Sequence, residues 1–556
     1  MNFYEQDPNL AFQLKHRLPA AFFVWADREL HAFGALCAGE IDQRAVHTDR
    51  EGQPKLIKYD RMGDDVSEVW LNEGYKKTVK ETYDRGIVGY VHKDIPELGQ
   101  KGNYLYSYAQ GYLLSHAEPG FYCPVTLTMA TAYLLDRYAD EQLKEAYLPH
   151  VLSTGETELY EGATFLTERQ GGSDVGANEV LAVKKGSEYR IYGEKYFASN
   201  AGACGVAMVL ARLDGAPKGS KGLSLFLVPW KKEDGKNNHI KIRRLKDKLG
   251  VRAVPSAEVE FEGAKAFLVG EAERGFYYMM EALNLSRICN AVASIGIMRR
   301  AYLEAREYAK KRDAFGNKLI DYPMIQDSLA KMAVKQEVET SAIFDLVASF
   351  DDWNKGNQNE VKTVLNRLLI AILKKESAEQ AIHFSHEAIE MHGGNGYIED
   401  FVTPRLLRDA QVLTVWEGTA NILGLEVLRL LRKYEAHKLF ESEVLERLDH
   451  VPDKLQPLRK QLRVAVTSLT DDCQHILEQE ESIQTFHSKK LAERMAAIFE
   501  GLIALEDAAK GDERKQKVAE IYFHQTFIHE ELETDPLTLK YFDAIIYQKW
   551  DTTITD

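Results

Sequence analysis

The segment TVWEGTANI, residues 414–422, places a carboxylate beside an indole, directly before an apolar stretch of helical periodicity. Thr419 is a favoured helix N-cap, so we expect Glu417 on a loop just before the helix formed by ANILGLEVLRLLRKY. Val415 and Trp416 indicate that this loop is buried. Burial raises a carboxylate pKa from about 4.3 toward the ~6–7 that suits a general base. Glu417 is therefore a candidate catalytic base, although the same sequence is also compatible with an ordinary glutamate on the protein surface.

Two further motifs could line an anionic or planar ligand. TERQGGSD, residues 167–174, has adjacent glycines that can adopt positive φ and expose successive amides, while Thr167 and Ser173 add hydroxyls. EKYFASN is typical of a strand with Phe197 and Ser199 on one face, which could border a cofactor. Taken alone, the first motif is also an ordinary turn, and the second a core phenylalanine beside a surface serine.

Two more motifs lie at the ends of predicted helices. In KKRDAFGNKL, Arg312 could bind a phosphate and Phe315 could stack on a base, with Phe315-Gly316 ending the helix. The basic residues could equally satisfy the helix dipole. In HGGNGY, residues 392–397, Gly393 is an ordinary helix stop. The second glycine and the Asn-Gly pair exceed what a cap needs, and they indicate close approach of backbone to a ligand.

The segment HFSHEAIEMH offers a rival interpretation as a metal site. It places His383, His386, Glu387 and Glu390 within about two helical turns. The spacing is not HExxH, and no second cluster supplies further ligands. We therefore expect histidines with ordinary partners, and no metal.

Composition bounds the class of protein. The chain has 556 residues, 45% hydrophobic and 28% charged, which predicts a soluble protein of several domains. A net charge of -15 argues against DNA or an anionic membrane as a partner. The five cysteines are scattered and never in CxxC spacing, as expected for reduced thiols in the cytoplasm. Neither a signal peptide nor an apolar run of the ~18 residues that span a membrane is visible.

The elements that must position these motifs follow in distinct segments. We expect a helical N-terminal domain over residues 1–158. Short, alternating, β-branched segments then predict a middle β domain, an antiparallel barrel or sandwich, over 159–272. Long helical periods predict a bundle over 273–436 and an acidic helical extension over 437–556. This order is an α+β multidomain plan.

In this order the motifs resemble the acyl-CoA dehydrogenase family of flavoproteins over about residues 100–435. The AidB-like branch is the more similar, because it shares the Gln-Gly-Gly-Ser-Asp loop, the Trp-Glu-Gly turn and a C-terminal helical extension. The resemblance implies a helical N-terminal domain, a middle β domain, a four-helix bundle and the extra extension. It also implies bound FAD and a homotetramer built as a dimer of dimers.

The resemblance further implies conversion of an acyl-CoA thioester to the trans-2-enoyl-CoA. Glu417 would take the α-proton while the β-hydrogen leaves as hydride to the flavin N5, and an electron-transfer flavoprotein would accept the electrons. In the family, the amide of the base belongs to the clamp on the thioester carbonyl. Ser173 and Arg287 would lie near the substrate, and Arg312 and Phe315 would reach the FAD of a neighbouring subunit. The residues assigned to FAD are Phe165, Leu166, Thr167, Ser173, Phe197, Ala198, Ser199, Arg312, Phe315, Gly393, Gly394, Thr419 and Asn421.

The sequence departs from the family at several positions. Arg169-Gln170-Gly171 replaces the usual Pro-Gly-Ala, Phe197 replaces a tryptophan that shields the flavin, and Glu390 stands where glutamine is common. Because of these changes, the sequence does not specify which acyl group the protein accepts. One alternative is an AidB-like stress-response or nucleic-acid-associated flavoprotein with weak dehydrogenase activity, against which the retained carboxylate and the acidic extension argue. Another is an oxidase that reduces oxygen.

Overall fold

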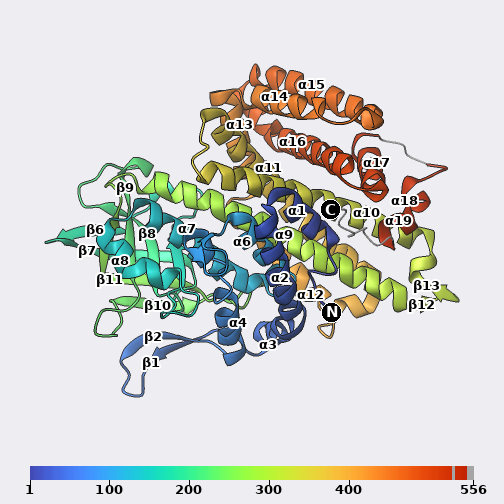
Figure 1. Ribbon diagram of the computed structural model, residues 1–556. Coiled ribbons are helices and arrows are strands. Elements are labelled where there is room, and N and C mark those ends of the chain that lie inside the picture. The colour runs from blue at the N-terminus through green and yellow to red at the C-terminus, as the bar shows by residue number, and fades with distance from the viewer. Residues whose placement is uncertain (529–532, 548–556) are drawn as a thin grey trace. The chain divides into compact units, whose positions relative to one another are not determined.

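A computed structural model of the protein describes residues 1–528 and 533–547. Its elements group into two compact units. The first unit comprises Met1–Asn2 and Ala32–Cys289, and the second comprises Phe3–His31 and Asn290–Asp556. The boundaries fall within two helices, α2 (Ala20–Leu36) and α9 (Gly275–Lys311). The predicted plan of a helical segment, a β segment and a helical segment with extra C-terminal helices is confirmed (Figure 1).

The first unit begins with helices and two small hairpins. All residues of α6 are buried, which removes the polar face that a surface helix would show. The hairpin of β1 and β2 is attached to the barrel strand β10, because Ser67 Oγ accepts a 2.8 Å hydrogen bond from the Ile242 amide. The elements are α3 (Asp42–Arg50), β1 (Lys55–Tyr59), β2 (Asp65–Trp70), α4 (Glu73–Tyr83), α5 (Gly89–His92), β3 (Asp94–Ile95), β4 (Gln100–Lys101), α6 (Tyr104–Ser115), α7 (Pro119–Tyr138) and α8 (Glu141–Val151).

The middle strands of this unit pair into a closed ring. The order β11–β7–β6–β8–β9 returns to β11, with β10 added to β11 and β5 added to β8. Of the two predicted arrangements, the pairing is therefore that of a barrel, and its core is apolar. The expectation of purely antiparallel pairing is wrong, because β5 and β6 both run parallel to β8. The strands are β5 (Gly162–Phe165), β6 (Leu181–Lys185), β7 (Glu188–Ser199), β8 (Val206–Leu213), β9 (Leu223–Pro229), β10 (Ile240–Leu245) and β11 (Ser256–Val269).

Among its described residues, the second unit is helical apart from one short hairpin. Helix α16 packs against α10, α11 and α13, so the extension is continuous with the bundle (Figure 1). The elements are α1 (Pro8–Arg17), β12 (Asp313–Ala314), β13 (Asn317–Lys318), α10 (Pro323–Asn354), α11 (Glu360–His392), α12 (Thr403–Leu413), α13 (Ala420–Tyr434), α14 (Ala436–Asp449), α15 (Gln456–Leu477), α16 (Glu481–Lys510), α17 (Glu513–Phe527), α18 (Leu537–Lys540) and α19 (Phe542–Ile546).

A buried polar network joins the two ends of the chain inside the second unit. Lys515 Nζ donates to Asn9 Oδ1 at 2.7 Å and to Asp507 Oδ2 at 2.9 Å. Gln13 Nε2 donates to the same Asp507 oxygen at 2.8 Å, and Asn9 Nδ2 donates to Ser341 Oγ at 3.2 Å. Helices α1, α10, α16 and α17 are therefore linked by charged and polar groups that water does not reach.

Across residues 1–528 and 533–547, no helix combines the length and the apolar character that crossing a bilayer requires.

Candidate active site

Glu417 lies on the turn between α12 and α13, in the second unit. Its φ is 61° and that of Gly418 is 102°, so two successive residues occupy the positive-φ region. Thr419 takes the N-cap position of α13, as predicted, although its side chain makes no capping hydrogen bond. A non-glycine residue in this region costs about 1–2 kcal/mol. Contacts elsewhere must offset that cost.

The loop around Glu417 is less buried than its sequence indicates. Val415 is 61% exposed, and Trp416 and Glu417 are only partly buried. The amides of Val415 and Trp416 both donate to the Val412 carbonyl at 2.9 Å, so the chain continues the turn of α12. That geometry directs the valine outward. The expectation of a buried loop is wrong for Val415, whereas Oε2 of Glu417 is buried, and a raised pKa for Glu417 stays a prediction.

A buried lysine that sequence analysis missed holds this turn. Lys374 on α11 is 1% exposed, and its Nζ donates to the Trp416 carbonyl at 2.6 Å and to the Gly418 carbonyl at 2.8 Å. Glu417 is the residue between these two carbonyls. The only signal in the sequence is a lysine pair, Lys374-Lys375, that follows the apolar run LLIAIL. Nothing in that run indicates a contact 42 residues away.

In the first unit, the structure brings two of the predicted cofactor motifs together. The Tyr196 amide donates to the Thr167 carbonyl at 3.0 Å, which joins β7 to the segment after β5. On β7 the ring of Phe197 is 57% exposed, whereas the next residue, Ala198, is fully buried, and Ser199 is partly buried. The predicted strand with an aromatic and a hydroxyl on one side is therefore confirmed, and its phenylalanine is not a core residue.

A buried ion pair fixes the start of the TERQGGSD loop. Lys195 Nζ lies 2.8 Å from Glu168 Oε1 and donates to the Leu166 carbonyl at 3.1 Å. Desolvation lowers the pKa of Lys195 to about 8. The Glu168 carboxylate also accepts the amides of Glu179 at 2.6 Å and Val180 at 3.2 Å. Leu166 and its neighbours are thereby held rigidly at the barrel edge.

The glycine loop itself is a turn with one close approach. Gly171 has φ 128°, and its amide donates to the Glu168 carbonyl at 3.0 Å, so this amide serves the turn. A Cβ added to Gly172 would lie 2.6 Å from Thr167 Oγ1, while Ser173 is exposed. Phe165, on the preceding strand, is 1% exposed within the barrel core. Its side chain faces the core, so only its main chain is available to a ligand.

Arg287 lies on the part of α9 that belongs to the first unit. It is buried, and Nη1 donates to Asn284 Oδ1 at 3.3 Å. Its assignment to the substrate stays a prediction.

The other predicted FAD residues lie in the second unit. Helix α9 ends at Lys311, and Phe315 and Gly316, with φ of 52° and 90°, form the turn of the β12–β13 hairpin. The expectation that they end a helix is wrong, because consecutive positive-φ residues are also typical of a tight hairpin. Phe315 is 98% exposed, and Arg312, just before β12, is exposed.

The HGGNGY glycines and the start of α13 are also accessible. Gly393, with φ 59°, ends α11 as predicted. A Cβ added to Gly393 or Gly394 would meet no atom within 4 Å, so the backbone there can be closely approached. Thr419 and Asn421 are both exposed.

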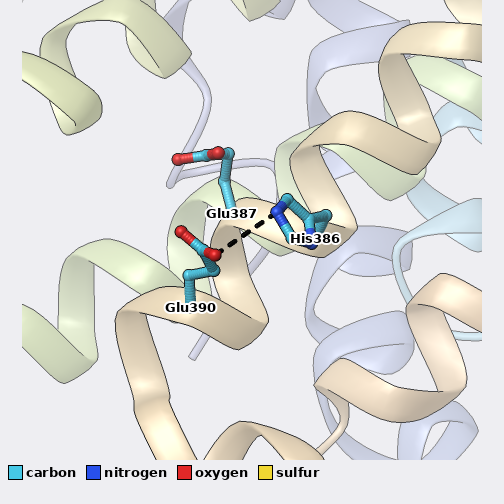
Figure 2. A group of neighbouring side chains, drawn as sticks. All are labelled: His386, Glu387 and Glu390. Atoms are coloured by element: carbon cyan, nitrogen blue, oxygen red, sulfur yellow. Dashed lines mark ion pairs between the residues drawn. The ribbon is translucent and has the colours of Figure 1, made fainter.

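The potential metal ligands on α11 form a surface cluster (Figure 2). His386, Glu387 and Glu390 offer ligand atoms within 4.8 Å of one another, and His386 Nε2 lies 3.5 Å from Glu390 Oε1. The side chains of His386 and Glu390 are 54% and 66% exposed. A single stretch of helix supplies all three groups, and water stabilises them, so the arrangement indicates a surface ion pair.

Comparison with known proteins identifies the family. Residues 273–431 match the acyl-CoA dehydrogenase C-terminal domain, residues 163–264 its middle domain, and residues 1–155 the N-terminal domain of the adaptive response protein AidB. Acyl-CoA dehydrogenase family member 11 of Caenorhabditis elegans is 31% identical over 94% of this chain and 86% of its own. The chain belongs to the acyl-CoA dehydrogenase family. Putative acyl-CoA dehydrogenase AidB of Escherichia coli is 32% identical to the present chain, over 68% of this chain and 69% of the AidB chain.

Solved structures agree with this acyl-CoA dehydrogenase assignment. C. elegans ACDH-11 in complex with C11-CoA has a TM-score of 0.88 and 28% identity, covering 99% of this chain and 95% of its own. An acyl-CoA dehydrogenase from Bacillus anthracis, complexed with FAD, has a TM-score of 0.71 and 20% identity, covering 86% of this chain and 87% of its own, and supports the fold alone. The predicted family and its AidB-like character are confirmed, and the protein is an FAD-dependent oxidoreductase.

The residues present fit a flavin dinucleotide. In the first unit, the exposed Phe197 ring and the Thr167 segment offer an aromatic surface and hydroxyls. In the second unit, Arg312 offers a cation, and Gly393 offers unobstructed backbone. These are groups that bind ring systems and pyrophosphate.

Proposed function

We propose that the protein dehydrogenates an acyl-CoA thioester to the trans-2-enoyl-CoA, with Glu417 as the base. The observation that carries the proposal is a carboxylate held at positive φ on the turn between α12 and α13, in a chain of this family. A carboxylate whose backbone is fixed in this way needs no rearrangement before it accepts a proton, and such positioning contributes strongly to rate.

In the proposed reaction, Glu417 removes the α-proton and its amide donates a hydrogen bond to the thioester oxygen. FAD, when bound, supplies the acceptor for the hydride that leaves the β-carbon. Loss of the proton and the hydride leaves the C=C bond. Ser173 and Arg287 are proposed to lie near the substrate. The residues that would hold FAD are Phe165, Leu166, Thr167, Ser173, Phe197, Ala198, Ser199, Arg312, Phe315, Gly393, Gly394, Thr419 and Asn421.

The proposed partners follow from the relatives. The C. elegans homologue binds C11-CoA, which supports a medium to long acyl group and a place in fatty acid metabolism. A relative 31% identical over 55% of this chain is named a subunit of a caffeyl-CoA reductase-Etf complex, which supports an electron-transfer flavoprotein as acceptor. We further propose a cytoplasmic homotetramer. Phe315, 98% exposed within its own chain, is suited to contact the FAD of a neighbouring subunit.

An anaerobic reaction tests the proposal. Purified protein reconstituted with FAD is mixed with C11-CoA, and the flavin absorbance is followed. The parent should bleach, and Glu417→Gln should bleach slower by at least ~10²-fold, since a positioned base contributes 10²–10⁴-fold. Equal rates for the two proteins would overturn the assignment of Glu417, and absence of bleaching in the parent with acyl chains of graded length would overturn the function.

The match of residues 1–155 to the AidB N-terminal domain favours a second candidate, a stress-response flavoprotein that associates with nucleic acid. Binding to duplex DNA that weakens steeply with added salt would support it. The net charge of -15 predicts no such binding.

A further inference from the structure

The ammonium group of Lys374 contacts both peptide groups that border Glu417. Its hydrogen bonds to the Trp416 carbonyl, at 2.6 Å, and to the Gly418 carbonyl, at 2.8 Å, are short for N–H···O contacts. Lys374 itself is 1% exposed on α11. A buried charge that donates to two carbonyls orients both of them firmly, because either carbonyl would lose a charge-assisted bond by turning away.

These contacts act directly on the amide of Glu417. The Trp416 carbonyl and the Glu417 N–H belong to one peptide group, and the structure has no cis peptide bond among its described residues. In a trans peptide the carbonyl and the N–H point in opposite directions. The N–H of Glu417 therefore points away from Lys374. A cation bound to the oxygen also draws electron density from the nitrogen, which strengthens the N–H as a donor.

We propose that Lys374 is a positioning residue for the dehydrogenation, through two linked effects. It holds Glu417 in its positive-φ conformation, and it polarises the 416–417 peptide so that the Glu417 amide stabilises the enolate oxygen more strongly. The inference rests on the proposed function, because it takes Glu417 as the base and its amide as a donor to the thioester. Charge develops on that oxygen in the transition state, so donor strength there affects rate more than substrate binding.

The adjacent lysine provides a matched control. Lys375 is also buried, but its Nζ donates to the Glu379 carboxylate at 2.9 Å and the Glu493 carboxylate at 3.2 Å. Both lysines lie on α11, and substitution of either removes one buried charge. Of the two lysines, Lys374 alone contacts the carbonyls on either side of Glu417. A general loss of stability should therefore affect both variants, whereas the proposed loss of activity should affect the Lys374 variant alone.

The kinetic test compares Lys374→Met with Lys375→Met in FAD-loaded protein, using C11-CoA. Lys374→Met should lower kcat by about 10-fold, less than the ~10²–10³-fold cost of removing an oxyanion donor because the Glu417 amide is still present, with KM changed less than ~3-fold. Lys375→Met should leave kcat close to the parent value. Lys374→Gln keeps an N–H donor group but loses the charge, so its kcat should fall between those of Lys374→Met and the parent. If the methionine variant does not fold, the comparison is made with Lys374→Gln.

A spectroscopic readout separates polarisation from structural damage. C11-CoA labelled with 13C at the thioester carbonyl is bound to Glu417→Gln, whose slow turnover leaves time for the measurement, and the carbonyl stretch is measured by infrared difference. In the double variant Glu417→Gln/Lys374→Met, the carbonyl stretching frequency should move from its value in Glu417→Gln back toward that of C11-CoA in solution. The double variant Glu417→Gln/Lys374→Gln serves the same purpose if the methionine variant does not fold. Parent-like kcat and an unmoved stretch would overturn the inference alone. Failure of the parent to bleach would instead overturn the proposed function, and equal rates for the parent and Glu417→Gln would overturn the assignment of Glu417 on which the inference rests.

Discussion

The phenol of Tyr83 donates a hydrogen bond of 3.1 Å to Oε1 of Glu161, inside the first unit. Glu161 immediately precedes β5, and its carboxyl group is buried. Desolvation raises its pKa to about 7, even though the hydrogen bond from Tyr83 acts in the opposite direction. The group is therefore neutral in mildly acidic solution and becomes charged near neutrality.

This shift predicts a pH dependence of stability. The folded-state pKa of Glu161 lies above its usual value of 4.5, so its stabilising contribution is complete below about pH 4.5 and is lost as the pH rises through about 7. Across that interval the parent should lose about 3 kcal/mol of unfolding free energy relative to Glu161→Gln. Urea unfolding at several pH values measures the difference. Glu158→Gln, at an exposed site, should show the same pH dependence of the unfolding free energy as the parent. An identical pH dependence in all three proteins would contradict the prediction.

The buried network around Lys515 predicts a large cost for one substitution. Lys515 Nζ lies 2.9 Å from a Glu337 carboxylate oxygen and 2.9 Å from an Asp507 oxygen, and its side chain is 1% exposed. Lys515→Met leaves both acids without this partner in a buried site, so we expect a loss of about 3–5 kcal/mol in urea unfolding. Lys517→Met, on the same helix, removes a pair with the exposed Glu513 and a cation–π contact with Tyr541, and it should leave the midpoint much closer to that of the parent. Equal midpoints for the two variants would refute the network's importance.

Strain at the turn that carries Glu417 predicts a gain in stability with a loss of activity. Glu417 has φ 61°, where glycine is favoured, so Glu417→Gly should stabilise the protein by roughly 1 kcal/mol. It should also abolish flavin bleaching by C11-CoA, because the proposed base is gone. Glu435, after α13, has φ 50° and is exposed, so Glu435→Gly should raise the thermal midpoint without affecting bleaching. If Glu417→Gly lowers the midpoint, the turn is not strained as described.

The hairpin tip predicts a defect in cofactor retention rather than in folding. Phe315 is 98% exposed, so Phe315→Ala should leave the thermal midpoint of the FAD-free protein unchanged. If the ring stacks on FAD of another subunit, removing it should weaken FAD binding by about 5–150-fold, in line with ~1–3 kcal/mol for stacking on a base. Fluorescence titration with FAD measures this, alongside sedimentation to give the subunit number. Met324→Ala, 83% exposed, serves as control. Unchanged FAD affinity in Phe315→Ala would exclude the contact.

The features of the site that follow local rules could be predicted from the sequence. Thr419 as an N-cap, Gly393 as a helix end and the strand carrying Phe197 all depend on a few neighbouring residues, and all are confirmed. The turn at Phe315-Gly316 is also local. The sequence does not distinguish it from a helix end, because a glycine that favours positive φ is typical of both structures.

The remaining features depend on contacts between distant segments. Lys374 and Lys195 look like ordinary lysines in a helix and a strand, and their burial comes from packing that no local pattern encodes. The exposure of Val415 likewise does not follow from its sequence, because hydrophobicity predicts burial only on average. The ring closure of the barrel rests on the pairing of β9 with β11, which the strand sequences leave unspecified.

The hydrogen bond between Lys515 and Asn9 joins residues 506 positions apart. A ribosome that adds about 5–20 residues per second needs roughly 25–100 s to reach the second partner after making the first. Part of α1 can meet α10 earlier, through Asn9 and Ser341, but the part that meets α16 and α17 stays uncovered throughout that interval. Newly made chains should accordingly depend on chaperones until translation is nearly finished, and release of a chain that stops short of Lys515 should yield a substrate for proteolysis.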